Sequence, residues 1–192
     1  RIVELVFSYP ASRRELQEMQ QDVRESLAAA EVYVRYCTSE TEKAALLFTY
    51  LAERFPYQQG DSRTPVYSAL CQGVANSKSM AQSWQLLCDE AGLSCRTVSG
   101  LRGGEAYWWN IVTLDGVSCH VDVLRDLLDG STLRLRYDED MAGGYYWDAE
   151  DVPACPAPAP EEEEPEAPAP TEDQPASEDP AEDPAETPEA QP

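Results

Sequence analysis

The chain has 192 residues and a formal net charge of −22, and its acidic residues are unevenly distributed. Thirteen of the 36 acidic residues follow Val152, which leaves a net charge of about −9 for residues 1–152. The 14 basic residues are scattered among acidic ones and form no phosphate-binding patch, so nucleic acid is excluded as a partner. No run of about 18 apolar residues occurs, so no membrane span is expected.

Composition divides the chain into two segments. Residues 1–152 have the composition of one ordinary acidic domain. Residues 153–192 are nearly all Pro, Ala, Glu and Asp, and they contain 12 of the 15 prolines. Such a segment cannot bury enough apolar surface to offset its ordering entropy. We therefore predict a folded domain at 1–152 and a disordered, proline-rich acidic tail at 153–192, which is either a solubilising spacer or a docking segment for a basic partner.

The first predicted elements are a strand and a helix. Residues 1–9 alternate and are rich in β-forming residues, which predicts a strand that Pro10 ends. Ser12 and Glu15 have the spacing of a capping box, so a helix is expected from there to about Ala30. The chain also opens on Arg1 inside this apolar stretch, without Met, which suggests a removed signal peptide or anchor and therefore a secreted or cell-surface protein.

A second helix follows a short ambiguous segment. Residues 31–37 fit either the end of a helix or a strand. Ser39 and Glu42 form a second capping-box pattern, and the apolar stripe behind it predicts a helix that ends near Phe55.

The middle of the chain predicts two helices separated by a turn. A short helix is expected at Tyr67–Cys71 and a turn at Gly73–Asn76. A longer helix is then expected at Ser77–Ala91, with Met80, Trp84, Leu87 and Cys88 buried and Gly92 as its C-terminal stop.

The last part of the domain predicts an antiparallel sheet. Asp115-Gly116 is a strong two-residue hairpin signal between two strands. A short strand at 133–137 and an aromatic cluster at 145–147 follow. The order of helices and then antiparallel strands indicates an α+β fold. The three main strands are expected at residues 94–101, 106–114 and 117–124.

The six cysteines form no CxxC pair, and with a single histidine they predict no zinc site and no other cofactor. A disulfide among Cys88, Cys95 and Cys119 is one alternative in an oxidising compartment, and buried free thiols are the other. The full set is Cys37, Cys71, Cys88, Cys95, Cys119 and Cys155.

Three segments resemble, in order and spacing, the nucleophile helix, histidine strand and aspartate strand of transglutaminase-like (papain-like) domains. They are YSALCQGVANSKSMAQSWQLLCDEAG at 67–92, EAYWWNIVTLDG at 105–116 and SCHVDVLRD at 118–126. The resemblance extends over nearly all of residues 1–155, including YYWDAEDVPAC at 145–155. It implies a papain-like, transglutaminase-core α+β fold: N-terminal helices, with the nucleophile-position helix packed on an antiparallel sheet.

The resemblance implies acyl transfer from glutamine, or peptide hydrolysis, through an acyl-cysteine intermediate. That chemistry needs a thiol at a helix N-terminus, an imidazole and an orienting carboxylate. Here Ser77 stands at the cysteine position and Tyr107 at the histidine position, and only Asp122 remains. A serine hydroxyl requires an adjacent base, and a phenol is protonated at neutral pH. No catalytic set is therefore intact.

Three points stay open at this stage. His120 lies two positions from Asp122, so a relocated Ser77–His120–Asp122 triad stands against a histidine with a purely structural role. Asp122 either hydrogen-bonds the backbone or the Tyr107 hydroxyl, or it holds a new ligand. Strand alternation puts Tyr107 on one face together with the second of two tryptophans, and the first on the other face. The candidates for lining a surviving cleft are Trp108, Trp109, Asn110 and His120.

These residues leave three hypotheses for the function. The first is a catalytically inactive (pseudoenzyme) domain that acts as a secreted or cell-surface binding or structural module for an unknown protein or peptide ligand. The second is an active acyl transferase or peptidase that uses Ser77 with His120 and Asp122. The third is a structural domain of a larger surface protein.

Overall fold

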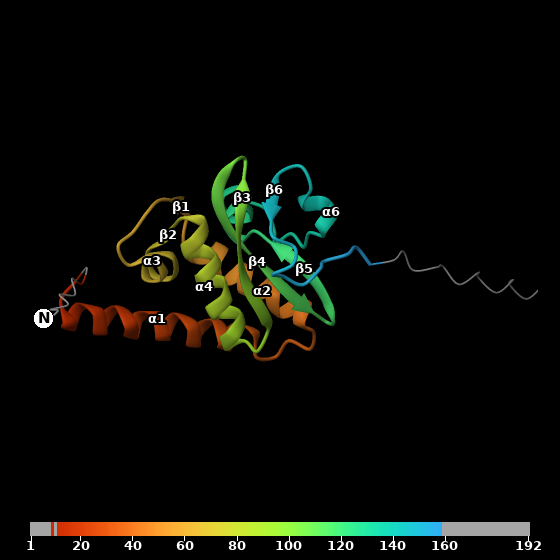
Figure 1. Ribbon diagram of the computed structural model, residues 1–192. Coiled ribbons are helices and arrows are strands. Elements are labelled where there is room, and N and C mark those ends of the chain that lie inside the picture. Colours follow the sequence, from red (N-terminus) through yellow and green to blue (C-terminus); the bar gives the residue numbers. More distant parts are fainter. Residues whose placement is uncertain (1–8, 10, 159–192) are drawn as a thin grey trace, which may run out of the picture. The chain divides into compact units, whose positions relative to one another are not determined.

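A computed structural model of the protein describes Tyr9 and residues 11–158, which combine helices with an antiparallel sheet (Figure 1). The strand predicted at 1–9 lies outside the described residues except for Tyr9, and so does the tail beyond Pro158. Within the described part, no helix has the length and apolar character needed to cross a membrane.

Helix α1 (Arg13–Val34) begins at the predicted capping box. The Ser12 side chain accepts the Glu15 N–H, and the Glu15 carboxylate accepts the Ser12 N–H at 2.8 Å. The helix continues beyond Ala30, so the ambiguous segment at 31–37 supplies its last turn and the bend that follows.

Helix α2 (Glu40–Arg54) is fixed at its first turn by the hairpin between two strands. The Ser39 hydroxyl caps it by accepting the Glu42 N–H. The Asp115 carboxylate accepts the N–H groups of Glu40 and Thr41 and the Thr41 hydroxyl, at 2.7–3.1 Å. These bonds, the Thr41 hydroxyl first, lower the pKa of Asp115.

The Asp115-Gly116 turn is confirmed as a two-residue hairpin loop. Asp115 has φ 51° and Gly116 has φ 86°, the left-handed pair that matches the twist of the flanking strands. The same turn therefore joins two strands and anchors a helix that lies 75 residues earlier in the chain.

A small pair of parallel strands that the sequence did not predict precedes helix α4 (Ser77–Glu90). Strand β1 (Gln58–Gln59) pairs with β2 (Val74–Ala75). Between them, α3 (Pro65–Tyr67) runs into a π-helical turn, so the expected short helix is present. Gly73 has φ 71°, and a Cβ there would lie 2.6 Å from Phe55 Cβ, so only glycine fits.

Helix α4 (Ser77–Glu90) begins at the predicted residue and packs on β3 and β4 (Figure 1). Asn76 is its N-cap and exchanges hydrogen bonds with Ser79, so the first turn is held on both sides. The predicted buried face is observed, and Trp84 is fully buried.

The four-stranded antiparallel sheet has the order β5-β4-β3-β6. Its last pairing, between β3 and β6, places the aromatic cluster at the sheet edge. The strands are β3 (Ser94–Arg102), β4 (Glu105–Leu114), β5 (Val117–Val121) and β6 (Tyr145–Trp147).

Two predictions about the strands are wrong. The third strand ends at Val121, because the Asp122 side chain accepts the Arg125 N–H and starts helix α5 (Val123–Leu128). The segment at 133–137 forms no strand. Only Arg136 pairs with His120, through two backbone hydrogen bonds, and this pairing is an isolated bridge. Helix α6 (Asp138–Met141) follows directly.

Apolar residues fill both faces of the sheet. The larger core lies between the helices and one face and includes Leu47, Trp84 and Val112. The smaller core lies on the other face around Trp109 and extends to Cys155. Cys155 is fully buried although it lies three residues beyond the composition boundary at Val152, which itself stays a prediction.

A buried ion pair holds α5 against the segment that follows it. Asp126 is fully buried, and Arg136 is 8% exposed. Two guanidinium nitrogens of Arg136 donate to the two carboxylate oxygens of Asp126, and the Arg134 N–H donates to the same carboxylate at 3.0 Å. Helix α5 follows Asp122, so this ion pair also helps to position that carboxylate.

We expect Asp126→Ala to lower the free energy of unfolding by about 3–5 kcal/mol, because it leaves the Arg136 guanidinium buried without a partner. Urea denaturation followed by tryptophan fluorescence measures this change. The matched control is Glu18→Ala, which removes the exposed pair with Arg14 and should leave the midpoint unchanged. Equal midpoints for Asp126→Ala and the parent protein would contradict the role given to the buried pair.

Candidate functional site

A groove of about 950 Å³ opens where α4 begins, and it contains two of the three positions singled out from the sequence. Ser77 is the first residue of α4 and is half-buried. Tyr107 on β4 forms part of the opposite wall. The other lining residues are Gln59, Asp61, Asn76, Lys78, Arg102, Gly103, Glu105, Ala106, Trp108, Arg125, Gly144 and Tyr145.

The third position, Asp122, lies beneath the groove and holds its wall together. Its carboxylate is 2% exposed and accepts the Tyr107 hydroxyl at 3.1 Å and the Tyr145 hydroxyl at 2.6 Å. It also accepts the Arg125 N–H at 3.2 Å. Ser77 and Asp122 line one small void below the groove. The structure thus brings the three triad-equivalent positions together, and Asp122 bonds both the Tyr107 hydroxyl and the backbone.

The Tyr107 hydroxyl is a proton donor where a catalytic base would have to accept a proton. Burial first, and then the neighbouring Asp122 carboxylate, raise the pKa of Tyr107 well above its ordinary value. The hydroxyl donates its proton to Asp122, and one of its lone pairs faces Arg102 Nη1 at 3.4 Å. Ser77 therefore has no base at this position.

In the structure His120 is bonded to residues other than Ser77 and Asp122, and the relocated triad stays a prediction. His120 is fully buried, and its ring lies against those of Trp109 and Trp147. Its Nδ1 accepts the Trp109 indole N–H at 3.0 Å, and its Nε2 contacts Asp138 Oδ1 at 2.9 Å. Both ring nitrogens are occupied, and the Asp122 carboxylate bonds tyrosines instead.

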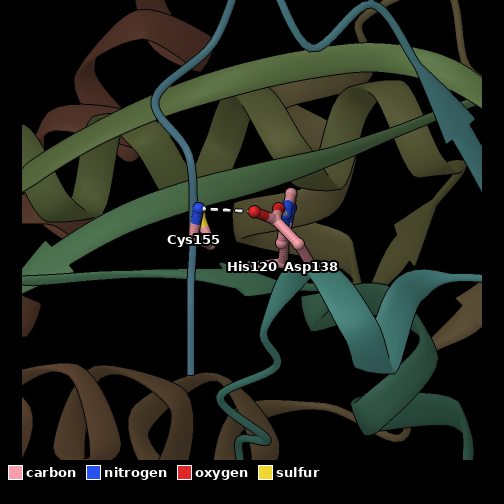
Figure 2. Close-up of side chains that lie close together, drawn as sticks. All are labelled: His120, Asp138 and Cys155. Atoms are coloured by element: carbon pink, nitrogen blue, oxygen red, sulfur yellow. Dashed lines mark hydrogen bonds and ion pairs between the residues drawn. The ribbon is translucent and has the colours of Figure 1, made fainter. Parts of the chain in front are cut away.

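His120, Asp138 and Cys155 form a cluster that sequence reasoning missed (Figure 2). Their nitrogen, oxygen and sulfur atoms lie within 4.8 Å of one another. The Asp138 carboxylate accepts the Cys155 N–H at 2.9 Å, and the Asp138 N–H donates to the Cys155 carbonyl at 2.8 Å. No local motif could have indicated this group, since its members come from β5, α6 and the segment that follows β6.

The proton on His120 determines what this cluster can do. The indole N–H of Trp109 can only donate, so Nδ1 accepts and the neutral ring carries its proton on Nε2, which donates to Asp138. A zinc ligand or a general base would need a lone pair on Nε2. Burial also raises the pKa of the Cys155 thiol to about 12, which disfavours the thiolate form. We interpret the cluster as a structural contact that holds the segment around Cys155 against β5 and α6.

The expected cleft residues divide between the groove and the core. Trp108 lines the groove, with Lys78 Nζ 5.4 Å from its ring centre. The structure instead buries Trp109 and Asn110, and the Asn110 amide donates to the Ala81 carbonyl on α4 at 2.9 Å. The groove residues that the sequence did not predict include Arg102 and Tyr145. The β3–β4 pairing brings Arg102 beside Tyr107, and the β3–β6 pairing brings Tyr145 beside Arg102.

All six cysteines are free thiols in the structure. The Cys88 side chain lies within hydrogen-bonding reach of Cys95, and burial first and this neighbour second raise the pKa of Cys88. Cys119 is buried in the same core, and burial raises its pKa to about 11. A disulfide among these three stays a prediction.

Comparison with known proteins gives one family and several similar solved structures. A family model described as the transglutaminase-like superfamily matches residues 27–123, about half of the chain. No curated protein sequence matches the chain. Similar solved structures include a proposed protease from Parabacteroides distasonis (14% identity, TM-score 0.42, 58% of this chain and 26% of that one). A proposed cysteine protease from Cytophaga hutchinsonii is also similar (10% identity, TM-score 0.45, 65% of this chain and 46% of that one). So is a TGase (12% identity, TM-score 0.46, 62% of this chain and 34% of that one). The chain thus spans less than half of each of these proteins.

We expect the protein to lose stability as the pH falls below about 6.5, because burial lowers the pKa of His120 in the folded state. Between the two pKa values the unfolded chain binds a proton that the folded chain does not, so acidification favours unfolding. His120 is the only histidine, so urea unfolding between pH 8 and pH 5.5 reports it directly. His120→Gln should be less stable at pH 8 but flatter across this range, and an equally steep decline in that variant would contradict the assignment.

We expect Tyr107→Phe to lower the free energy of unfolding by about 1–2 kcal/mol, since one oxygen of the buried Asp122 loses a hydrogen-bond donor. Thermal and urea denaturation measure the loss. Tyr146→Phe is the matched control, because that tyrosine is 62% exposed and should tolerate the change. Identical effects of the two substitutions would show that the bond to Asp122 does not contribute to stability.

Proposed function

Because the chain belongs to the transglutaminase-like superfamily and has Ser77 and Tyr107 at the two reacting positions, we propose that its domain is catalytically inactive and binds peptides in the surviving groove. One observation carries the proposal. The Tyr107 hydroxyl donates to Asp122, the carboxylate that would otherwise orient a catalytic imidazole.

The loss of activity follows from the proton balance at Ser77. Acyl transfer through a serine requires a group that removes the hydroxyl proton as the bond to the substrate carbonyl forms. Tyr107 keeps its own proton, and both ring nitrogens of His120 are bonded to Trp109 and Asp138. Loss of one member of such a unit typically lowers the rate by about 10⁴–10⁶-fold, and loss of the second adds little. Under this proposal, the Ser77 hydroxyl therefore lacks a catalytic base.

The groove itself supports a binding role. It is about 950 Å³, the size of a ligand site, and aromatic side chains line it beside polar and charged ones. Tyr107 and Tyr145 are fixed by the buried Asp122, so this wall requires little ordering when a ligand binds. An extended peptide suits a groove that combines aromatic surface with hydrogen-bonding groups.

A secreted or cell-surface location is part of the proposal. In an oxidising compartment, the proximity of Cys88 and Cys95 would favour a disulfide between them. Thiol labelling of native material with and without reductant tests this location. A fully reduced Cys88 in the native protein would argue for a reducing compartment.

We expect no incorporation of a fluorescent primary amine into a glutamine peptide above background with the parent protein, and measurable incorporation or peptide hydrolysis with Ser77→Cys combined with Tyr107→His. The double change supplies a thiol at the α4 N-terminus and an imidazole next to Asp122. Fluorescence transfer measures the amine reaction, and mass spectrometry detects the acyl adduct.

Three controls define the outcome. Each single substitution should stay inactive, because a thiol without a base and a base without a thiol are both incomplete. Adding Asp122→Ala to the double variant should remove the gained activity. Turnover by the parent protein that Ser77→Ala abolishes, or an acyl adduct recovered on Ser77, would contradict the proposed function.

A further inference from the structure

We propose, on the basis of the peptide-binding function above, that the groove selects peptide segments that carry carboxylate side chains. Three basic side chains line the groove, and two of them, Lys78 and Arg102, carry the inference. Within residues 11–158, neither lies within ion-pair distance of an acidic group, although the protein is strongly acidic.

Arg102 is held in position by aromatic rings rather than by an acid. Its guanidinium carbon lies 5.1 Å from the ring centre of Tyr107 and 5.6 Å from that of Tyr145. Both rings are fixed in turn by Asp122. The guanidinium has five N–H donors, and its one described side-chain bond is the 3.4 Å contact to the Tyr107 hydroxyl. A planar, oriented donor group of this kind matches a carboxylate.

Lys78 is the second basic group and is exposed at the start of α4. Its ammonium lies 5.4 Å from the ring centre of Trp108, so the aromatic face and the charge are presented together. An acidic residue flanked by an apolar one in the ligand would satisfy both.

The other charged side chains that line the groove are Arg125, Asp61 and Glu105. Arg125 Nε lies 3.6 Å from Asp129 Oδ2, so this guanidinium has an acidic partner. The Asp61 carboxylate accepts a hydrogen bond from the Asn76 side-chain amide at 2.7 Å. Glu105 is exposed at the rim. The lining thus holds three basic and two acidic side chains, although residues 1–152 have a net charge of about −9. This overall charge repels a polyanion at longer range, so a peptide with one or two carboxylates fits better than a nucleic acid.

The test is selection of binders from a displayed library of randomised short peptides on the intact protein. Selected peptides should be enriched in Asp and Glu. Replacing Glu by Gln or Asp by Asn in the best binder should weaken its affinity about tenfold, and added salt should weaken the acidic peptide more than its neutral analogue.

Variants of the protein localise the effect. Arg102→Gln and Lys78→Gln should each weaken the acidic peptide about tenfold and leave the neutral analogue unchanged. Arg14→Gln is the matched control, because it removes the same charge from an exposed site on α1 outside the groove. Thermal unfolding verifies that the variants stay folded.

The outcomes separate this inference from the function on which it rests. Groove-dependent binders that are neutral or basic, or acidic binders that ignore Arg102→Gln and Lys78→Gln, would overturn the inference and leave peptide binding in place. A selection that yields no peptide whose binding depends on the groove would overturn both. Preferential binding of single-stranded nucleic acid would also overturn the choice of a peptide.

Discussion

The hydrogen bonds to the buried Asp122 carboxylate are the interactions on which the rest of this structure depends. They join Tyr107 on β4, Tyr145 on β6 and the first turn of α5 at one point. A buried carboxylate must be fully bonded to be tolerated, so each of these donors is strongly constrained. The groove wall, the end of strand β5 and the orientation of Arg102 all follow from this one group.

The same bonds are compatible with a tyrosine at the position where the resemblance places a catalytic histidine. A tyrosine hydroxyl satisfies the carboxylate as an imidazole N–H would, so the packing requirement is met. The difference lies in the proton. An imidazole has a second nitrogen that can accept a proton from a nucleophile, whereas the phenol has only its hydroxyl, and here that hydroxyl donates to the carboxylate. Under the proposed function, Tyr107 therefore keeps the packing around Asp122 and lacks the proton acceptor that the reaction needs.

Local patterns in the sequence predicted much of the fold, and long-range contacts account for most of what they missed. The capping boxes at Ser12 and Ser39 and the Asp115-Gly116 turn are short-range signals and could be read directly. The end of β5 could not, because Asp122 acts there as a helix cap rather than a strand residue. The place of Tyr145 in the groove and the His120 cluster depend on pairings between distant segments, which periodicity does not encode.

The hydrogen bonds between Asp138 and Cys155 also determine where this domain can be shortened. Composition changes at Val152, and a truncation there would follow the visible boundary. It would also remove the Cys155 N–H and carbonyl that bond Asp138, together with the side chain that fills the smaller core. Water would then reach the ring of His120, which is completely covered in the intact fold. The smallest self-sufficient version of this domain therefore includes Cys155, inside what composition alone would assign to the tail.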